Sequence, residues 1–324
     1  MPDPTERVAL GRTAVQVTRL GLGCAPLGNL YRPITDAAAR ATVDAAWAAG
    51  LRWFDTAPLY GHGLAEERLG ASLRGRRRAE FAIATKVGRR LEPGVDPDTI
   101  FAAVPPRRPV FDFSADGIRR SFDDSLVRLG LDRVDVVHVH DPDQHEGEAL
   151  SGALPTLARL RTEGVIGAVG VGMNQAAMPL RFVDAGLVDC VLLAGRYTLL
   201  DQGGLALLDR CAQTGVGIIA GGVFNSGLLA DPAPGAHFDY APAPKELIER
   251  ARRIGAVCAR HDVPLRAAAL QFPLLHPAVC TVLTGARSPD EVAENARAFA
   301  MPTAADLWLD LRAAGLLRAD APIA

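Results

Sequence analysis

Short hydrophobic runs alternate with longer segments of helical periodicity along this chain of 324 residues. Eight of the runs predict strands, and most of these are almost continuously apolar, which is typical of parallel strands that are covered on both faces. Glycine, proline and polar residues mark where the runs end. The predicted strands are Leu20–Cys24, Trp53–Asp55, Phe81–Lys86, Asp135–His140, Ala168–Val171, Cys190–Ala194, Gly217–Ala220 and Thr281–Thr284.

Helical patterns separate and follow these strands. They cover Thr35–Ala49, Gly63–Leu73, Ser114–Leu129, Gly147–Thr162, Ala176–Ala185, Leu205–Gln213, Lys245–Arg260, Leu265–Leu275, Pro289–Phe299 and Thr303–Ala314. Eight strands that alternate with helices predict an α/β fold, a closed (β/α)8 TIM barrel that forms one domain over residues 1–324.

Three connecting segments add to this barrel. Val8–Leu10 and Val15–Thr18 predict an N-terminal β-hairpin that plugs the bottom of the barrel. Gly88–Phe113 and Asn225–Pro244 are long loops that follow the third and seventh strands. Both leave the carboxyl ends of strands, where the active sites of such barrels lie, and long loops are usually functional.

Charge and composition exclude several classes of protein. Lys+Arg 35 against Asp+Glu 37 gives a net charge of −2, which argues against a nucleic-acid partner. No run of 18 apolar residues indicates a membrane span, and the first residues lack the apolar core of a secretory signal. The five cysteines are scattered, which favours free thiols in the cytoplasm and argues against a metal site. We therefore expect a cytoplasmic protein with a small-molecule substrate.

Reactive side chains stand at three successive strand ends. Asp55 ends the second strand, Lys86 the third, and His138 and His140 the fourth, while Tyr60 follows Asp55 by five residues. A free tyrosine has a pKa near ~10, and a nearby ammonium group favours its phenolate form. Such a tyrosine can exchange a proton with an alkoxide, and the reaction at carbon then needs a nicotinamide as hydride partner.

Each of these residues also has a structural interpretation. An Asp55–Lys86 ion pair between neighbouring strands can serve stability alone, and Tyr60 can be a packed loop aromatic. His138 and His140 share one face of the strand, so one of them can be a packing residue. The His138-x-His140 pair also allows a metal-dependent hydrolase, although further ligands at other strand ends are missing.

The chain resembles the aldo-keto reductase family over essentially its whole length. The matching segments are Leu20–Gly23, Phe54–Gly61, Ala84–Lys86, Val134–His140, Gly170–Asn174 and Gly285–Asn295. The resemblance implies a catalytic tetrad of Asp55, Tyr60, Lys86 and His140, with Tyr60 as the proton donor or acceptor. It selects His140 rather than His138 because the family's histidine directly precedes an X-Pro step, here Asp141-Pro142.

Further segments are similar to the aldose 1-dehydrogenase branch, which includes L-fucose and D-threo-aldose dehydrogenases. They are Phe111–Ser114, Arg120–Gly130, His140–Asp143, Leu193–Asp201 and Gly221–Gly227. The resemblance implies oxidation of the anomeric C1 hydroxyl of an aldose to an aldonolactone. A pyridoxal 4-dehydrogenase is also similar, so a pyridoxal or a general aldehyde or ketone substrate is the alternative. A further alternative is a nicotinamide-binding barrel without catalytic activity, and the intact tetrad argues against it.

Two positions depart from the wider family at the substrate pocket. Ala25 and Asp141 stand where bulky aromatic residues are common. A small residue and a carboxylate suit a hydroxyl-rich ring, which needs buried hydrogen-bond partners. We expect Ala25, Tyr60, His140 and Asp141 to contact the substrate, with Asp141 accepting a bond from a sugar hydroxyl. Capping of the following turn is the alternative role for Asp141.

The predicted cofactor is NAD, favoured over NADP. No Rossmann fingerprint is present, so phosphate binding falls to the loops after strands seven and eight. Gly285 and Glu291 stand where many NADP-dependent relatives have basic residues, which favours NAD. Arg287 is a basic residue in the same segment and favours NADP. The resemblance implies that the family's usual nicotinamide contacts fall at Ala194 and Gly221, so Arg196 or Tyr197 can replace them. The expected cofactor-binding residues are Gly23, Cys24, Asn174, Gly222, Phe224, Asn225, Ser226, Gly227, Gly285, Arg287, Glu291, Glu294 and Asn295.

Overall fold

Eight parallel strands close into a barrel in the computed structural model, which describes residues 2–239 and 241–323. The predicted (β/α)8 fold is therefore confirmed, and all eight predicted strands belong to the barrel. In order around it, the strands are β3 (Leu20–Gly23), β4 (Trp53–Asp55), β5 (Ala82–Val87), β8 (Val134–His140), β9 (Ile166–Met173), β10 (Cys190–Ala194), β11 (Gly217–Gly221) and β14 (Val279–Gly285).

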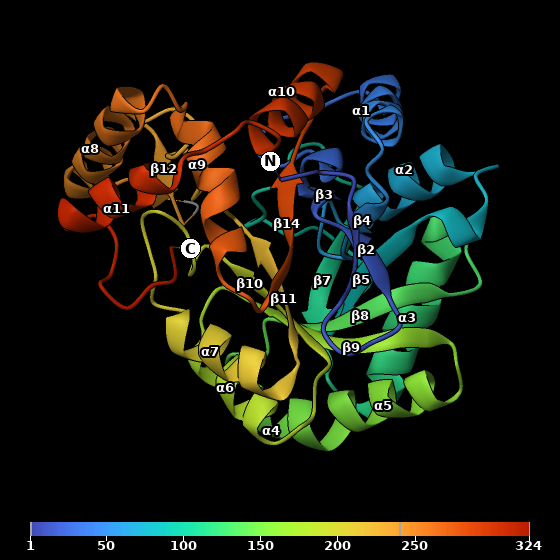
Figure 1. Ribbon diagram of the computed structural model, residues 1–324. Coiled ribbons are helices and arrows are strands. Elements are labelled where there is room, and N and C mark those ends of the chain that lie inside the picture. The colour runs from blue at the N-terminus through green and yellow to red at the C-terminus, as the bar shows by residue number, and fades with distance from the viewer. Residues whose placement is uncertain (1, 240, 324) are drawn as a thin grey trace.

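Helices form the outer layer around these strands (Figure 1). They are α1 (Asp36–Ala48), α2 (Leu64–Leu73), α3 (Ala115–Leu129), α5 (Leu154–Thr162), α6 (Ala177–Asp184), α7 (Leu205–Thr214), α8 (Lys245–Arg260), α9 (Leu265–Gln271), α10 (Pro289–Phe299) and α11 (Ala305–Ala313). Short hydroxyl side chains begin three of them. Thr35, Ser114 and Ser288 accept hydrogen bonds from backbone N–H groups in the first turns of α1, α3 and α10.

Two predicted helices are interrupted. The segment predicted as one helix over Gly147–Thr162 contains the short α4 (Glu146–Glu148), a π-helical turn (η3, Ala149–Ala153) and then α5. Pro155 follows the wide turn, and proline has no N–H to donate to a regular helix. The segment predicted over Leu265–Leu275 changes after Gln271 to a 3₁₀ turn (η4, Phe272–Leu275) that contains Pro273. Two further 3₁₀ turns are η1 (Ala25–Gly28) and η2 (Arg78–Glu80).

The N-terminal hairpin closes the bottom of the barrel, as predicted. Its strands are β1 (Arg7–Ala9) and β2 (Gln16–Thr18). Leu10 and Val17 of this segment are fully buried and belong to the same hydrophobic cluster as Trp53 and Ile219 inside the barrel. These side chains fill the interior of the barrel at this end, and the cavity beside the strand ends opens at the opposite, carboxyl side.

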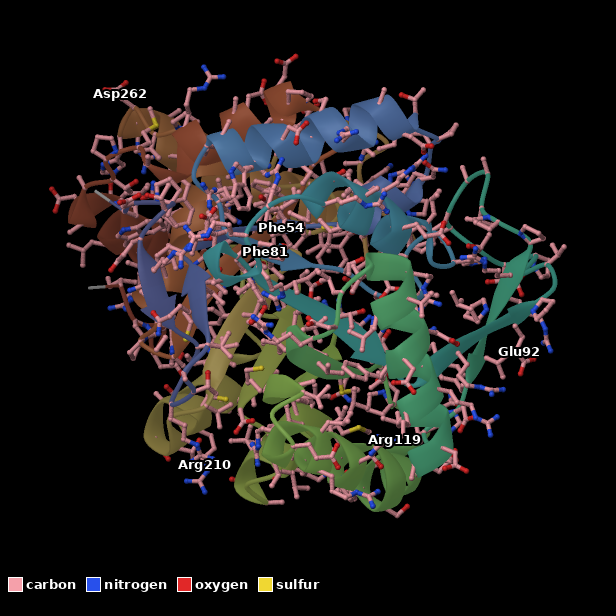
Figure 2. The ribbon with its side chains drawn as sticks, turned by 90° about the vertical axis from the view of Figure 1, so that its right-hand side faces the viewer. Phe54, Phe81, Glu92, Arg119, Arg210 and Asp262 are labelled. Carbon is pink, nitrogen blue, oxygen red and sulfur yellow. The ribbon has the colours of Figure 1, made fainter. Side chains whose placement is uncertain are left out.

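A second, larger core lies between the barrel and the helices. It contains Phe54, Phe81 and Phe122, with the rings of Phe54 and Phe81 meeting edge to face at 6.3 Å (Figure 2). Burying such aromatic side chains contributes the largest apolar areas to a core. The two cores fix the strand ends from both sides.

The long segment after β5 is not an irregular loop. It forms an antiparallel hairpin of β6 (Arg89–Pro93) and β7 (Arg107–Phe111), and Figure 2 shows Glu92 where this hairpin projects from the barrel. The sequence carries no period-2 hydrophobic pattern here because neither face of the hairpin is fully buried. The segment after β11 also contains a small hairpin, of β12 (His237–Phe238) and β13 (Ala241–Pro242).

Candidate active site

Asp55 and Lys86 form a buried ion pair at the ends of neighbouring strands. The Lys86 Nζ donates to Asp55 Oδ1 at 2.6 Å and to the carbonyl oxygen of Thr56 at 3.0 Å. Both residues are at most 2% exposed. Burial opposes the charge of the ammonium group, but the Asp55 carboxylate and Tyr60 raise the pKa of Lys86 above its ordinary value. Lys86 is thus held charged although its side chain is buried.

Tyr60 lies above this pair, in the tight turn that follows β4. The Lys86 Nζ lies 4.6 Å from the centre of the Tyr60 ring. The turn is fixed by a close backbone contact: a Cβ on Gly61, whose φ is 61°, would lie 2.4 Å from the carbonyl oxygen of Gly28. Only glycine fits there, so Gly61 and Gly28 determine where Tyr60 stands.

His140 faces Tyr60 from the end of β8. The two rings are perpendicular, at 89°, with centroids 6.0 Å apart. Burial first, and then the positive charges of Arg89 and Lys86, lower the pKa of His140 well below its ordinary value. His140 is therefore neutral at pH 7, with one ring nitrogen able to donate a hydrogen bond and the other to accept one.

His138 has a different place, inside the barrel. It packs against Gly170, where a Cβ would come within 2.2 Å of the imidazole Nδ1. Both of its ring nitrogens are buried and have no hydrogen-bond partner within the described residues. Of the two histidines left open by the strand pattern, the structure places His140, and not His138, beside Tyr60.

Asp141 is already paired in this structure. Its carboxylate accepts a hydrogen bond from Arg89 Nη2 at 2.8 Å, and the same oxygen lies 3.5 Å from His140 Nε2. Burial raises the pKa of Asp141, and Arg89 acts in the opposite direction. Arg89 was not a predicted site residue, because nothing in its Arg-Pro-rich segment distinguishes it from Arg90.

A cavity of about 400 Å³ opens next to Tyr60 at the carboxyl ends of the strands. Of the predicted residues, it is lined by Gly23, Ala25, Asp55, Tyr60, Asn174, Gly222, Phe224, Asn225, Ser226, Gly227, Gly285, Arg287, Glu291 and Asn295. Two predicted cofactor residues lie outside it. Cys24 is fully buried in the core between barrel and helices, and Glu294 points toward solvent with its carboxylate 3.9 Å from Arg266.

The predicted substitutes for the nicotinamide contacts do not reach this cavity. Tyr197 is 3% exposed and stacks on Phe272 in the core, with ring centroids 5.2 Å apart. The Arg196 guanidinium pairs with Asp239, at 2.6 Å for the shorter contact. Asp239 itself lines the cavity, so this pair ties the β12 end of the long loop to the segment after β10.

Arg266 is a cation of the cavity that sequence reasoning missed. It extends from α9, lies with its guanidinium carbon 5.4 Å from the centre of the Phe224 ring, and donates to Asn295 Oδ1 at 3.0 Å. Glu291 is paired with Arg287, through the Arg287 backbone N–H at 3.0 Å and the guanidinium Nε at 3.7 Å. No sequence motif brings α9 to this site; only the packing of α9 against α10 does so.

The segment 94–106, between β6 and β7, docks on the catalytic turn. His62 holds it from below: the Arg107 carbonyl oxygen lies 2.6 Å from Nδ1, and the Thr99 hydroxyl 3.1 Å from Nε2. Phe101 of this segment packs on Tyr60, with ring centroids 6.1 Å apart. We define residues 94–106 as the docked loop. It forms one wall beside Tyr60, and it lies within Gly88–Phe113, the long segment that the sequence placed at the active-site end of the barrel.

Within residues 2–239 and 241–323, no three His, Cys, Asp or Glu side chains are arranged to hold a metal ion. In the same part of the chain, no helix has the length and hydrophobicity needed to cross a membrane.

Comparisons with known proteins agree on one family. A family model described as "Aldo/keto reductase family" matches residues 19–314. A D-threo-aldose 1-dehydrogenase of a Pseudomonas species is 42% identical over 95% of this chain and 97% of its own length. A pyridoxal 4-dehydrogenase of Microbacterium luteolum is also 42% identical, over 97% and 98%. An L-galactose dehydrogenase of Arabidopsis thaliana is 34% identical, over 90% and 86%.

Solved structures support the same grouping. The holo form of an aldo-keto reductase from Bacillus halodurans superposes with a TM-score of 0.77 at 26% identity, covering 97% of each chain.

Proposed function

Because this chain belongs to the aldo-keto reductase family of oxidoreductases, we propose that it oxidises the anomeric C1 hydroxyl group of an aldose to an aldonolactone. The observation that carries the proposal is the group formed by Asp55, Tyr60, Lys86 and His140, of which Asp55 and Tyr60 line the cavity. Similarity to a D-threo-aldose and an L-galactose dehydrogenase supports an aldose as the substrate.

In this proposal Tyr60 is the group that exchanges a proton with the reacting oxygen. The Lys86 ammonium next to its ring favours the phenolate, which accepts the proton of the C1 hydroxyl. Asp55 keeps Lys86 charged and oriented. Neutral His140, facing Tyr60, donates a hydrogen bond that positions the same oxygen.

The cavity fits a nicotinamide dinucleotide, which would supply the hydride acceptor when bound. Gly222, Asn225, Ser226 and Gly227 all have positive φ, between 45° and 99°, so this loop presents backbone rather than large side chains. A Cβ on Gly227 would meet nothing within 4 Å, and the buried Asn225 Oδ1 has no partner among the described residues. Such backbone concavities bind phosphate groups. Asn174, Arg287 and Asn295 line the same cavity.

We propose NAD rather than NADP as the preferred cofactor. Glu291 lies in the first turn of α10 and presents a negative charge to the cavity, which opposes a 2′-phosphate and suits ribose hydroxyls. Arg287 pairs with Glu291, and Arg266 lies 3.9 Å from the Glu294 carboxylate, so both cations of this part of the cavity already have acidic partners. Titration of protein fluorescence with NADH and NADPH tests this directly. Glu291→Gln should narrow the difference between the two dissociation constants, and tighter NADPH binding by the unmodified protein would refute the preference.

Pyridoxal is the second candidate substrate, because its dehydrogenase is as similar to this chain as the aldose enzyme. Aldoses close to cyclic hemiacetals in water, and pyridoxal, which carries a hydroxymethyl group next to its aldehyde, does the same. Oxidation of either ring form at the hemiacetal carbon gives a lactone. One proton acceptor and one oxygen-positioning group, as in Tyr60 and His140, serve both substrates.

Formation of NADH or NADPH at 340 nm with a panel of aldoses and pyridoxal tests the proposal. We expect turnover of L-fucose, L-galactose or D-arabinose, and its loss in Tyr60→Phe with NADH binding retained. Tyr197→Phe is the matched control, since it removes a phenolic hydroxyl that is buried in the core and has no hydrogen-bond partner among the described residues. Near-normal turnover by Tyr60→Phe would refute the assignment, and activity on pyridoxal alone would replace the aldose.

A further inference from the structure

Arg89 and Asp141 meet beside the catalytic histidine, although they lie in segments that follow different strands of the barrel. Arg89 begins the β6–β7 hairpin that follows β5, and Asp141 follows β8. Arg89 Nη2 donates to Asp141 Oδ2 at 2.8 Å, and that oxygen lies 3.5 Å from His140 Nε2. Their side chains are 19% and 29% exposed, so the pair is partly desolvated and still open to a ligand.

The surroundings hold both partners in place. Asp141 has a φ of 44°, which is unfavourable for a residue other than glycine, and its N–H donates to the Gly172 carbonyl at 3.1 Å. The Arg89 guanidinium lies 4.6 Å from the centre of the Phe111 ring, its partner across the hairpin. The pair is therefore pre-organised, which lowers the entropic cost of binding a ligand.

We infer that Arg89 and Asp141 form a subsite for the hydroxyl group on the carbon next to the reacting carbon, an inference that rests on the proposed function. The reacting oxygen is taken to lie at Tyr60 and His140, so the neighbouring oxygen of the substrate lies close to Asp141 Oδ2. A carboxylate only accepts hydrogen bonds. It therefore binds a hydroxyl group and not the ring oxygen of a sugar, which has no hydrogen to donate.

The charges of the subsite define the class of substrate further. Arg89 and Asp141 neutralise each other, so the subsite suits an uncharged hydroxyl that donates to the carboxylate and accepts from the guanidinium. A simple aldehyde without this hydroxyl would displace water from Arg89 and Asp141 and form no hydrogen bond with them in its place. Sites built to bind a hydroxyl group reject analogues that lack it for this reason. The favoured substrates are hemiacetals or carbonyl compounds with a vicinal hydroxyl.

Comparison of L-fucose with 2-deoxy-L-fucose tests the subsite. We expect the unmodified protein to prefer L-fucose in kcat/KM by roughly 10- to 100-fold, the range for hydrogen bonds to charged groups. Asp141→Gly removes the carboxylate, and glycine accepts the positive φ without strain. In this variant and in Arg89→Met, the ratio of kcat/KM for L-fucose to kcat/KM for 2-deoxy-L-fucose should be close to one. The matched control is Arg90→Met on the same hairpin, since Arg90 pairs with Glu92 and Asp112 instead and should keep the preference.

The preference for L-fucose over 2-deoxy-L-fucose shows whether Arg89 and Asp141 bind the hydroxyl group or only support the structure. If the variants lose the same factor on both sugars, or if the unmodified protein shows no preference, the subsite is wrong while the aldose function stands. If no aldose is oxidised, reduction of lactaldehyde is compared with that of propanal. A preference for lactaldehyde that both variants lose would support the subsite and reject the aldose function. Equal reduction of lactaldehyde and propanal would reject both the subsite and the aldose function.

Discussion

Removing the Lys86 ammonium group separates what the Asp55–Lys86 pair does for stability from what it does for catalysis. The three variants are Lys86→Met, Asp55→Leu and the double substitution. Each single change leaves one buried group without its partner: Asp55 is 2% exposed, and its second oxygen already has no hydrogen bond within the described residues. The double change leaves no buried charge at all.

The expected free energies follow from this burial. Removing one member of a buried pair costs about 3–5 kcal/mol, whereas replacing both members by apolar residues of similar size is often close to neutral. We expect each single variant to lose about 3–5 kcal/mol of unfolding free energy. The double variant should be more stable than either single variant, which gives a large coupling energy in the cycle.

The pH dependence identifies the group responsible. Burial raises the pKa of Asp55 even with Lys86 present, and removal of the ammonium raises it further. An aspartate with a raised folded-state pKa binds its proton more tightly in the folded than in the unfolded chain, where the value is about 3.9. Its stabilising contribution is complete at low pH and is lost as pH rises through the folded-state pKa. The unfolding free energy of Lys86→Met should therefore fall as pH rises above about 4, by at most about 1.4 kcal/mol per pH unit.

Guanidinium denaturation followed by circular dichroism at several pH values between 5 and 8 measures both effects. The double variant, which has no carboxyl group at this position, is the reference for the pH slope. A cost below 1 kcal/mol for Lys86→Met, or a cost that does not change with pH, would refute the reasoning. Turnover is the second readout: we expect all three variants to be inactive, so an active double variant would make the pair structural only.

Three other substitutions give independent predictions. Glu66 is fully buried and accepts from Arg128 Nε at 2.6 Å, so Glu66→Ala should lower the unfolding free energy by about 3–5 kcal/mol; denaturant midpoints within error of the unmodified protein would contradict this. The lowered pKa of His140 places the acid limb of kcat/KM well below pH 6.5, and Arg89→Met, which removes a nearby positive charge, should move that limb upward. A pH profile that does not move would show that the limb belongs to another group. Gly61→Ala should cost about 1–3 kcal/mol and displace Tyr60, measured as lower Tm and kcat together, since a Cβ there has no room; unchanged values of both would disprove the contact.

The barrel and its reactive strand ends were predictable because strands that are buried on both faces consist mainly of apolar residues. Parallel strands covered on both faces read as apolar runs, and the polar residue that ends each run stands at the ligand edge of the barrel. Asp55, Lys86 and His140 are such residues, and the structure brings them together around Tyr60. The order of the strands therefore predicted that Asp55, Lys86 and a histidine of the fourth strand lie close together, and the family resemblance selected His140.

The rest depends on contacts between segments that lie far apart in the sequence. Arg89 and Arg90 look alike in the chain, and only the pairing of Arg89 with Phe111 across the hairpin turns one of them toward Asp141. Arg266 enters the cavity through the packing of α9 against α10. Cys24 was predicted to touch the cofactor, but its side chain is fully buried in the core between the barrel and the helices.

The docked loop is fastened to the catalytic turn through two residues, His62 and Tyr60. The ring nitrogens of His62 contact Thr99 and the Arg107 carbonyl, and Phe101 packs on Tyr60. Backbone hydrogen bonds, from Tyr31 N–H to the Ile100 carbonyl and from Ala102 N–H to the Asn29 carbonyl, also join the loop to residues 29–31. Transplanting residues 94–106 from a related enzyme should therefore change substrate range while leaving the tetrad in place, provided that His62, Arg107 and the backbone pairing with residues 29–31 are kept.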